Sequence, residues 1–163
     1  MSKLTTSFPR LRTLCVVLSI FLTGIVFAQT EDSALNMVRE LCLGQNLGGM
    51  SYKLSKVTIS FQGIAAKVGP QKVDEMLKAE LALAVPRHQD QGNRNLAKAW
   101  APLMTASEFD SMDANKQKSP YAAKFSSLQN QAGAAMKANS EKLLTTVMTE
   151  ALSKAFEKSV GRK

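Results

Sequence analysis

The chain is poor in the side chains from which most catalytic centres and metal sites are built. Its 163 residues include one histidine, His88, and two cysteines, Cys15 and Cys42. A structural zinc site takes about four thiolate or imidazole ligands, and a Ser-His-Asp arrangement would depend on His88 alone. His88 lies in "VPRHQDQGN", which we predict to be a solvent-facing turn. Such a turn is unfavourable for a catalytic base, which must be held in position. We expect no enzyme, no cofactor and no metal.

Phosphate-binding and calcium-binding patterns are also missing. The glycines of "LGQNLGG" lack the spacing and the following Lys-Ser/Thr pair of a phosphate loop. The acidic stretch "TASEFDSMDANKQKSP", residues 105–120, contains Asp110 and Asp113 at the wrong spacing for a calcium loop and has no glycine. Neither segment predicts a ligand.

The N-terminus has the three parts of a secretory signal. Three basic residues precede an apolar run from Leu14 to Phe27, and the small residues Val26 and Ala28 stand before a cleavage point. The run is shorter than the roughly 20 residues that span a bilayer. We predict cleavage near Ala28 on the general secretory route, a mature chain from Gln29, and a periplasmic or secreted location.

The positive charge is modest and dispersed. The formal net charge of +8 falls to +5 when residues 1–28 are removed, because that segment contributes Lys3, Arg10 and Arg12 and no acid. The remaining lysines are scattered, so they form no concentrated footprint for nucleic acid. We expect no nucleic-acid partner and at most a weak contact with anionic membrane.

Cleavage would leave Cys42 as the one cysteine of the mature chain, so no internal disulfide can form. In "LNMVRELCLG" it stands beside Leu41 on a predicted helical face, which predicts a buried, inert thiol. A secreted domain without disulfides depends on its hydrophobic core.

Apolar periodicity predicts an all-α, single-domain helical bundle over residues 29–163, with about five to six helices. The first helix should begin at Ser33 as N-cap and stop at Gly44. The steps of three and four between Met50 and Val68 predict one helix, although "KVTISF" also fits a strand. Gly69 should end that helix and Pro70 start the next. The predicted inward side chains are Leu35, Val38, Leu41, Met50, Leu54, Val57, Phe61, Ile64, Val68, Val73, Leu77 and Leu81.

In the second half, we expect Pro86 to stop a helix and Asn93 to cap the next one, which carries Trp100 in the core and is kinked or shortened by Pro102. Pro120 should open a long C-terminal helical segment to residue 158, broken near Asn139 and Ser140. Its inward residues are predicted to be Tyr121, Phe125, Leu128, Ala132, Met136, Leu143, Val147, Leu152 and Phe156.

The acidic stretch of residues 105–120 is best explained by the helix boundaries that it specifies. Thr105 and Glu108 have the T-x-x-E spacing of a capping box, in which each side chain satisfies a free backbone N–H at a helix start. Phe109 and Met112 supply the buried face of this helix. Ser119 and Pro120 then provide an N-cap and a first-turn proline, so the stretch predicts a helix, a corner and another helix.

Residues 95–150 resemble the exported helical family catalogued as domain of unknown function 2059. The residues that fit its central pattern are Thr105, Glu108, Phe109, Ser119, Pro120 and Lys124. Asn115 and Lys116 stand where the family usually has aromatics, and Ala122 where glycine is common, so the chain resembles a divergent relative. The resemblance implies an all-helical fold and export, and it brings no established activity.

These observations predict an exported, non-enzymatic helical protein that binds another macromolecule, most simply a protein, in the bacterial envelope. We expect its contact surface between the C-terminal helices and the helix of residues 105–118. Two alternatives stay open: an inhibitor or immunity protein that neutralises a toxin or hydrolase, and a peripheral membrane protein. The membrane alternative uses the basic C-terminal segment with Lys142, Leu143, Leu144, Met148, Lys154, Phe156, Lys158, Arg162 and Lys163.

Overall fold

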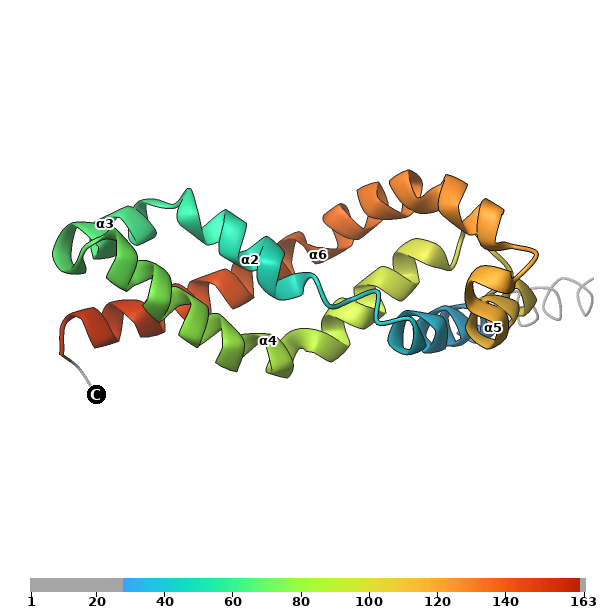
Figure 1. The fold of residues 1–163 in the computed structure, drawn as a ribbon, viewed down its shortest axis with the longest axis horizontal. Coiled ribbons are helices and arrows are strands. Elements are labelled where there is room, and N and C mark those ends of the chain that lie inside the picture. Colours follow the sequence, from blue (N-terminus) through green and yellow to red (C-terminus); the bar gives the residue numbers. More distant parts are fainter. Residues whose placement is uncertain (1–27, 162–163) are drawn as a thin grey trace, which may run out of the picture.

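Two long helices, α4 (Pro70–Trp100) and α6 (Ala122–Ser159), run side by side along the length of the molecule (Figure 1). The computed structural model describes residues 28–161, which form an all-α helical bundle without a strand in that range. The shorter elements are helical residues 28–40, α2 (Leu47–Lys56), α3 (Ile59–Val68), α5 (Ala106–Asn115) and the 3₁₀ turn η1 (Lys116–Lys118). The predicted fold class and the long C-terminal helix are confirmed.

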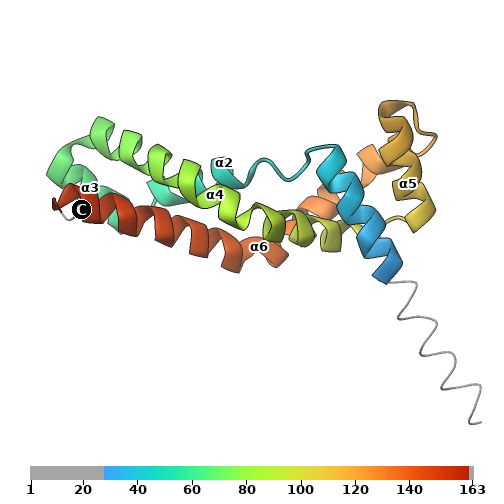
Figure 2. The same cartoon turned by 90° about the horizontal axis from the view of Figure 1, so that it is seen from below.

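The short helices cover opposite ends of the α4–α6 pair. Figures 1 and 2 show α2 and α3 against one half of it, and residues 28–40 with α5 at the other. The buried apolar residues of the described chain form one cluster in each half. In the second cluster, the rings of Trp100 and Phe125 stack with their centres 4.2 Å apart, which confirms Trp100 as a core residue.

Several predicted boundaries are confirmed. Gly69 separates α3 from α4 with a φ of 90°, which favours glycine, and Pro70 occupies the first turn of α4. Val73 and Leu77 beyond it are completely buried. At the other end, α4 stops at Trp100, just before Pro102.

The first helix differs from the prediction at both ends. Ser33 lies inside a helix that already includes Ala28, because a serine costs only about 0.5 kcal/mol in a helix interior and does not force a start. The helix ends at Glu40, where the Leu43 N–H donates to Val38 and the Cys42 N–H to Arg39. This is a Schellman ending, and Cys42 holds its left-handed position with a φ of 53°. The predicted buried thiol is wrong, since Cys42 is exposed.

The predicted single helix from Met50 to Val68 is two helices, and the strand alternative is wrong. Thr58 breaks the helix because its hydroxyl accepts the Phe61 N–H at 3.2 Å as the N-cap of α3. The break rotates the helices relative to each other, so Phe61 is buried while Val57 is 76% exposed.

Pro86 does not end a helix. It lies inside α4, which bends near its middle (Figure 1). An interior proline removes a backbone hydrogen bond and costs about 3 kcal/mol. Contacts on either side hold the helix together: Ala84 is buried, and His88 reaches Glu150 of α6. The predicted turn and the Asn93 cap are therefore wrong.

The predicted break at Asn139 and Ser140 is also wrong, because α6 is continuous there. The Asn95 side-chain amide of α4 donates to the Asn139 carbonyl at 3.0 Å and to the Ser140 hydroxyl at 3.3 Å. Ser140 is completely buried, and it packs against α4 instead of capping a helix.

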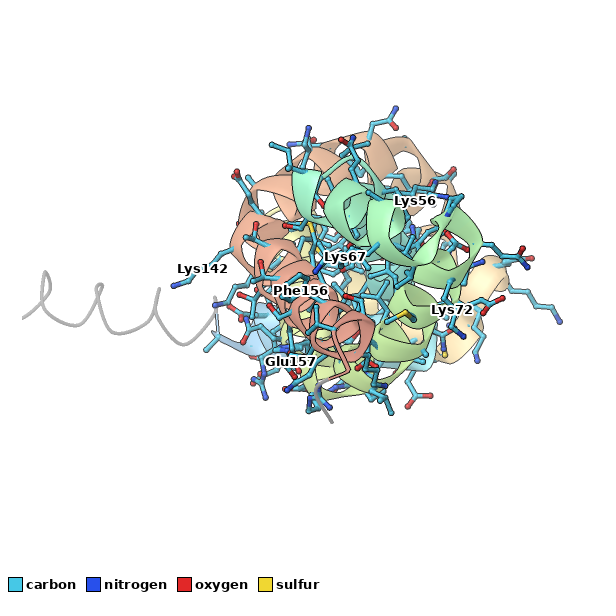
Figure 3. The ribbon with its side chains drawn as sticks, turned by 90° about the vertical axis from the view of Figure 1, so that its left-hand side faces the viewer. Lys56, Lys67, Lys72, Lys142, Phe156 and Glu157 are labelled. Carbon is cyan, nitrogen blue, oxygen red and sulfur yellow. The ribbon has the colours of Figure 1, made fainter. Side chains whose placement is uncertain are left out.

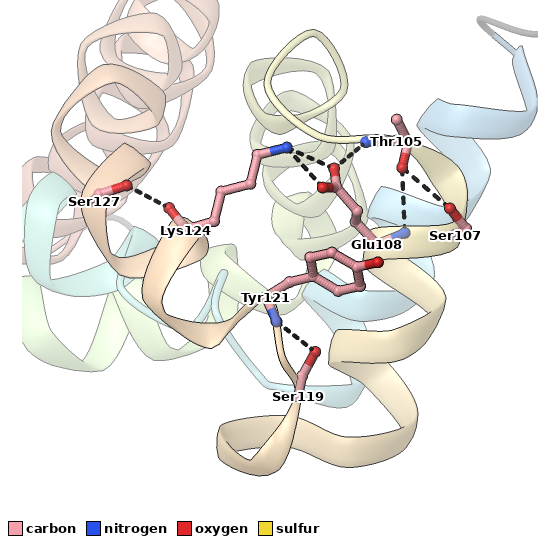
Figure 4. A network of polar contacts seen from close by, with 7 residues as sticks. All are labelled: Thr105, Ser107, Glu108, Ser119, Tyr121, Lys124 and Ser127. Atoms are coloured by element: carbon pink, nitrogen blue, oxygen red, sulfur yellow. Dashed lines mark hydrogen bonds and ion pairs between the residues drawn. The ribbon is translucent and has the colours of Figure 1, made fainter.

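The predicted capping box of the acidic stretch is confirmed. The Thr105 hydroxyl accepts the Glu108 N–H, and the Glu108 carboxylate accepts the Thr105 N–H at 2.8 Å, which completes the capping box (Figure 4). Phe109 and Met112 are buried. α5 ends at Asn115 and the 3₁₀ turn η1 follows it, so the helix is three residues shorter than predicted.

The predicted start of the next helix is wrong. α6 begins at Ala122 with Tyr121 as N-cap, so Ser119 does not cap it and Pro120 lies before its first turn. The Ser119 hydroxyl instead accepts the Tyr121 N–H at 3.2 Å within the corner.

The predicted signal cleavage and the predicted exported location rest on the sequence alone. Residues 1–27 of the predicted signal lie outside the described range. Within residues 28–161, no helix combines the length and the apolar character that crossing a membrane requires.

Candidate functional site

A groove lies between α3 and the C-terminal half of α6. Its floor includes the buried side chains of Ile64 from α3 and Leu152 from α6, and its volume is about 670 Å³. At one end, the Lys67 ammonium stands 5.1 Å from the centre of the Phe156 ring, with Glu157 nearby (Figure 3). The Phe156 side chain remains 46% exposed at this rim.

A second groove of about 570 Å³ continues along α6 beneath the link between α2 and α3. Leu54 and Val57 border it from one side, and Leu144 of α6 contributes to its floor. Both grooves are lined by Thr58 and Met148, so they join into one surface. We call this the α6 groove. It follows residues 134–157, about 35 Å at a rise of about 1.5 Å per residue.

The groove is apolar at its edge because α2 packs with its small residues inward. Ser51 and Ser55, one turn apart, are completely buried, while Leu54 is 44% exposed. The Ser55 hydroxyl is satisfied by the Ser51 carbonyl at 2.8 Å. Small side chains bring α2 close to both α4 and α6, and the larger aliphatic residue is left at the rim.

The charges on the groove are mixed. Lys67 and Glu157 lie in one part of it, and Lys137 and Glu141 in the other. Glu157 is held 2.9 Å from Lys154 on the same helix. The polar lining is otherwise mainly hydroxyl groups: Thr58, Ser60, Thr145, Thr149 and Ser153. The surface therefore offers apolar area and hydroxyl hydrogen bonds in place of a concentrated charge.

A polar cluster ties α2 to α4. Asp74 pairs with Lys78 at 2.7 Å and with Lys56 at 3.3 Å, and it accepts the Tyr52 hydroxyl. The Lys78 and Tyr52 hydrogen bonds hold the pKa of Asp74 well below its usual range, and the pKa values of Lys56 and Lys78 are raised by their hydrogen bonds in this cluster. Groups shifted in these directions keep their charge near neutral pH, so none is suited to proton transfer there.

His88 is not the solvent-facing loop residue that we predicted. Its side chain is 24% exposed on α4, and its Nε2 lies 2.9 Å from Glu150 of α6. Arg87 pairs with the same carboxylate, and the His88 and Arg87 hydrogen bonds together lower the pKa of Glu150. These contacts hold α4 to α6 beside Pro86.

We predicted a contact surface between the C-terminal helices and the helix of residues 105–118, but the structure places the continuous groove elsewhere on α6. Lys124 of α6 pairs with Glu108 of α5 at 2.7 Å, so the beginning of α6 is bonded directly to that helix (Figure 4). A cavity at the end of α5 is lined by Leu41, Leu43 and residues 114–118, and not by α6. The continuous groove on α6 lies in the other half of the molecule.

The C-terminal helix of the membrane alternative uses its apolar side within the bundle. Leu144 is buried, and Leu143 and Met148 pack against the first core cluster. Lys158 pairs with Glu80 of α4. Arg162 and Lys163, which this alternative also included, lie outside the described residues.

Within residues 28–161, no group of three or more histidine, cysteine, aspartate or glutamate side chains is placed to hold a metal ion. Comparisons of the chain with protein-family models, with curated proteins and with solved structures gave no match. Membership of the family that residues 95–150 resemble therefore stays a prediction.

Proposed function

We propose that the protein is an exported, non-enzymatic helical protein that binds another macromolecule, a protein, in the bacterial envelope through the α6 groove. The observation that carries this proposal is the exposure of large apolar side chains along its edge. Leu54 and Phe156 are 44% and 46% exposed, and Val57 is 76% exposed. Contiguous apolar surface in water is typical of sites that a partner covers.

The shape of the groove suits an elongated partner segment. An amphipathic helix binds by placing its apolar face in a groove of this kind. The floor side chains Ile64, Leu144 and Leu152 are fixed by the core, so the surface is preorganised and loses little side-chain entropy on binding. The hydroxyl groups of the lining supply hydrogen bonds at the edge.

A non-enzymatic role is supported by the state of the ion-paired acids. Asp74, Glu108 and Glu150 each have a lowered pKa because cations and hydrogen-bond donors surround them. Acid–base catalysis works best with a group whose pKa is near the operating pH. The location in the envelope rests on the N-terminal sequence pattern.

The test is affinity capture of the tagged protein, expressed in its own host, after chemical crosslinking of the intact envelope. We compare the natural sequence with a Leu54→Ser, Phe156→Ser double variant and with Leu83→Ser. Leu83 is a matched control because it is an exposed leucine, at 59%, that lines neither part of the groove. Circular dichroism verifies that all three proteins fold.

One protein partner that is lost from the double variant and retained by Leu83→Ser would support the proposal. If that partner is a toxin or hydrolase, the protein is its inhibitor. Equal recovery of the same partner by all three proteins would place the contact elsewhere and contradict the assignment of the groove.

A further inference from the structure

The link between α2 and α3 is a projecting corner with two aliphatic side chains in water. Val57 is 76% exposed and Ile59 is 87% exposed, on either side of the Thr58 cap. Figure 1 shows the link at the outer edge of the molecule. Val57 borders the α6 groove, but Ile59 lines neither part of it. The bundle itself makes no use of the apolar surface of this corner.

The corner belongs to a segment that carries positive charge only. Between residues 41 and 73 there is no acid, and the four basic residues are Lys53, Lys56, Lys67 and Lys72. Lys56 and Lys72 pair with acids of α4. Within the described part of the chain, Lys53 and Lys67 have no carboxylate partner. Figure 3 shows Lys56, Lys67 and Lys72 at the end of the molecule that α3 covers.

The chemistry of the corner fits a lipid surface better than a protein surface. The cores of protein interfaces are enriched in aromatic residues and arginine and depleted in lysine. Apart from the uncharged amide of Gln62, the exposed residues from Val57 to Ala66 are aliphatic, small or hydroxylic, and they include neither an aromatic residue nor an arginine. Aliphatic side chains flanked by lysines suit an anionic bilayer, which takes the former into its acyl boundary and the latter at its phosphates.

We propose that the α2–α3 corner is a membrane-contact site for anionic lipid. Val57 and Ile59 enter the boundary between headgroups and acyl chains, and Lys53 and Lys67 lie at the level of the lipid phosphates. This site is separate from the predicted membrane contact of the C-terminal helix. It also goes beyond protein binding at the α6 groove, because a corner held at the membrane leaves most of that groove open to a partner.

The test places an environment-sensitive fluorophore on the corner of the full chain. Cys15 and Cys42 are replaced by serine, and the dye is attached through Ile59→Cys or, as a control, through Leu83→Cys on the exposed side of α4. Each protein is titrated with vesicles of phosphatidylglycerol and phosphatidylethanolamine, and with vesicles of phosphatidylcholine alone. The dye reports its own surroundings, so other membrane contacts of the chain do not produce the signal.

We expect a blue shift at position 59 with anionic vesicles, weaker with phosphatidylcholine and reduced by salt, and no comparable shift at position 83. Adding Val57→Ser to the labelled chain should raise the lipid concentration at half-maximal shift, and Lys53→Gln with Lys67→Gln should raise it about tenfold, equivalent to about 1.4 kcal/mol.

Three results would overturn the membrane site: no shift at position 59, an equal shift at positions 59 and 83, or equal shifts with both kinds of vesicle. A shift produced by envelope proteins and not by vesicles would assign the corner to a protein partner instead. The three vesicle results do not bear on partner capture through Leu54 and Phe156, so the two proposals fail independently.

Discussion

Glu80 is an acid placed where the bundle is otherwise apolar. Its side chain is 6% exposed on α4, and its partner is Lys158, near the end of α6. A buried carboxylate without a cation is costly, because the protein interior replaces water poorly as its solvent. The pair therefore fixes the C-terminal end of α6 against α4, beside the α6 groove.

Replacing Lys158 by methionine keeps the length of the side chain and removes its charge. We expect a loss of about 1–3 kcal/mol in the free energy of unfolding, because Glu80 would be buried without its partner. Urea denaturation measures the change. The control is Lys154→Met, which breaks a pair with Glu157 in which both side chains are about half exposed, so little change is expected. Equal losses in the two variants would show that burial of Glu80 does not decide the effect.

The backbone conformation of Cys42 is strained, and its side chain is not buried in the core. Its φ of 53° is costly for a side chain with a Cβ, and its exposed thiol makes no compensating burial. Cys42→Gly should raise the free energy of unfolding by about 0.5–1 kcal/mol, since glycine adopts this conformation freely at the end of a helix. Cys42→Ala keeps the strain and should change little. A Cys42→Gly protein no more stable than Cys42→Ala would contradict this account.

At the scale of elements, α2 decides the shape of the groove. It packs against α4 and α6 through Ser51, whose buried hydroxyl has no hydrogen-bond partner among the described residues. Ser51→Leu should cost about 1–3 kcal/mol in thermal unfolding experiments, because the added carbons have no room between the helices. Ser51→Ala retains the small size and should be neutral or stabilising. A stabilising Ser51→Leu would mean that α2 does not pack as closely as described.

The start of α5 gives a pH-dependent prediction. Hydrogen bonds from Lys124 and the Thr105 backbone lower the pKa of Glu108 below its usual 4.5. A carboxylate with a lowered pKa stabilises the fold fully above its unfolded pKa, and this stability is lost as pH falls through the folded value.

We therefore expect Glu108→Gln to lower the melting temperature more at pH 7 than in acid below the lowered pKa of Glu108, where the natural carboxyl is protonated. Thr105→Ala should cost about 1 kcal/mol at both pH values, because a hydroxyl cap does not titrate. A Glu108→Gln effect that is the same at both ends of the pH range would contradict the ion pair with Lys124.

Local signals predicted the elements whose ends are set locally. The capping box at Thr105 and Glu108 and the boundary at Gly69 and Pro70 needed only the backbone preferences of those residues. Pro86 and Ser140 led to wrong predictions of helix ends. They carry the same kinds of local signal, but they lie inside helices that tertiary contacts keep continuous. Their continuity depends on packing between α4 and α6, which no short window of sequence contains.

At the scale of the whole molecule, the sequence predicted an all-α bundle but not its functional surface. From the apolar periodicity we predicted that Leu54 and Val57 point inward, because one continuous helical stripe would bury the most apolar area. The fold instead buries Ser51 and Ser55, and it leaves the aliphatic residues along α6. Two signals pointed to this arrangement: the Thr58 cap in the middle of the apolar stripe and the one-turn spacing of the two serines.

The most direct test of the α6 groove as the binding surface is photocrosslinking in living cells. A photoreactive amino acid is placed at Ser153, which is exposed in the groove, or at Gln129, which is exposed elsewhere on α6. The account predicts a discrete crosslinked protein partner from position 153 and none from position 129. The same product from both positions, or a product from position 129 alone, would contradict it.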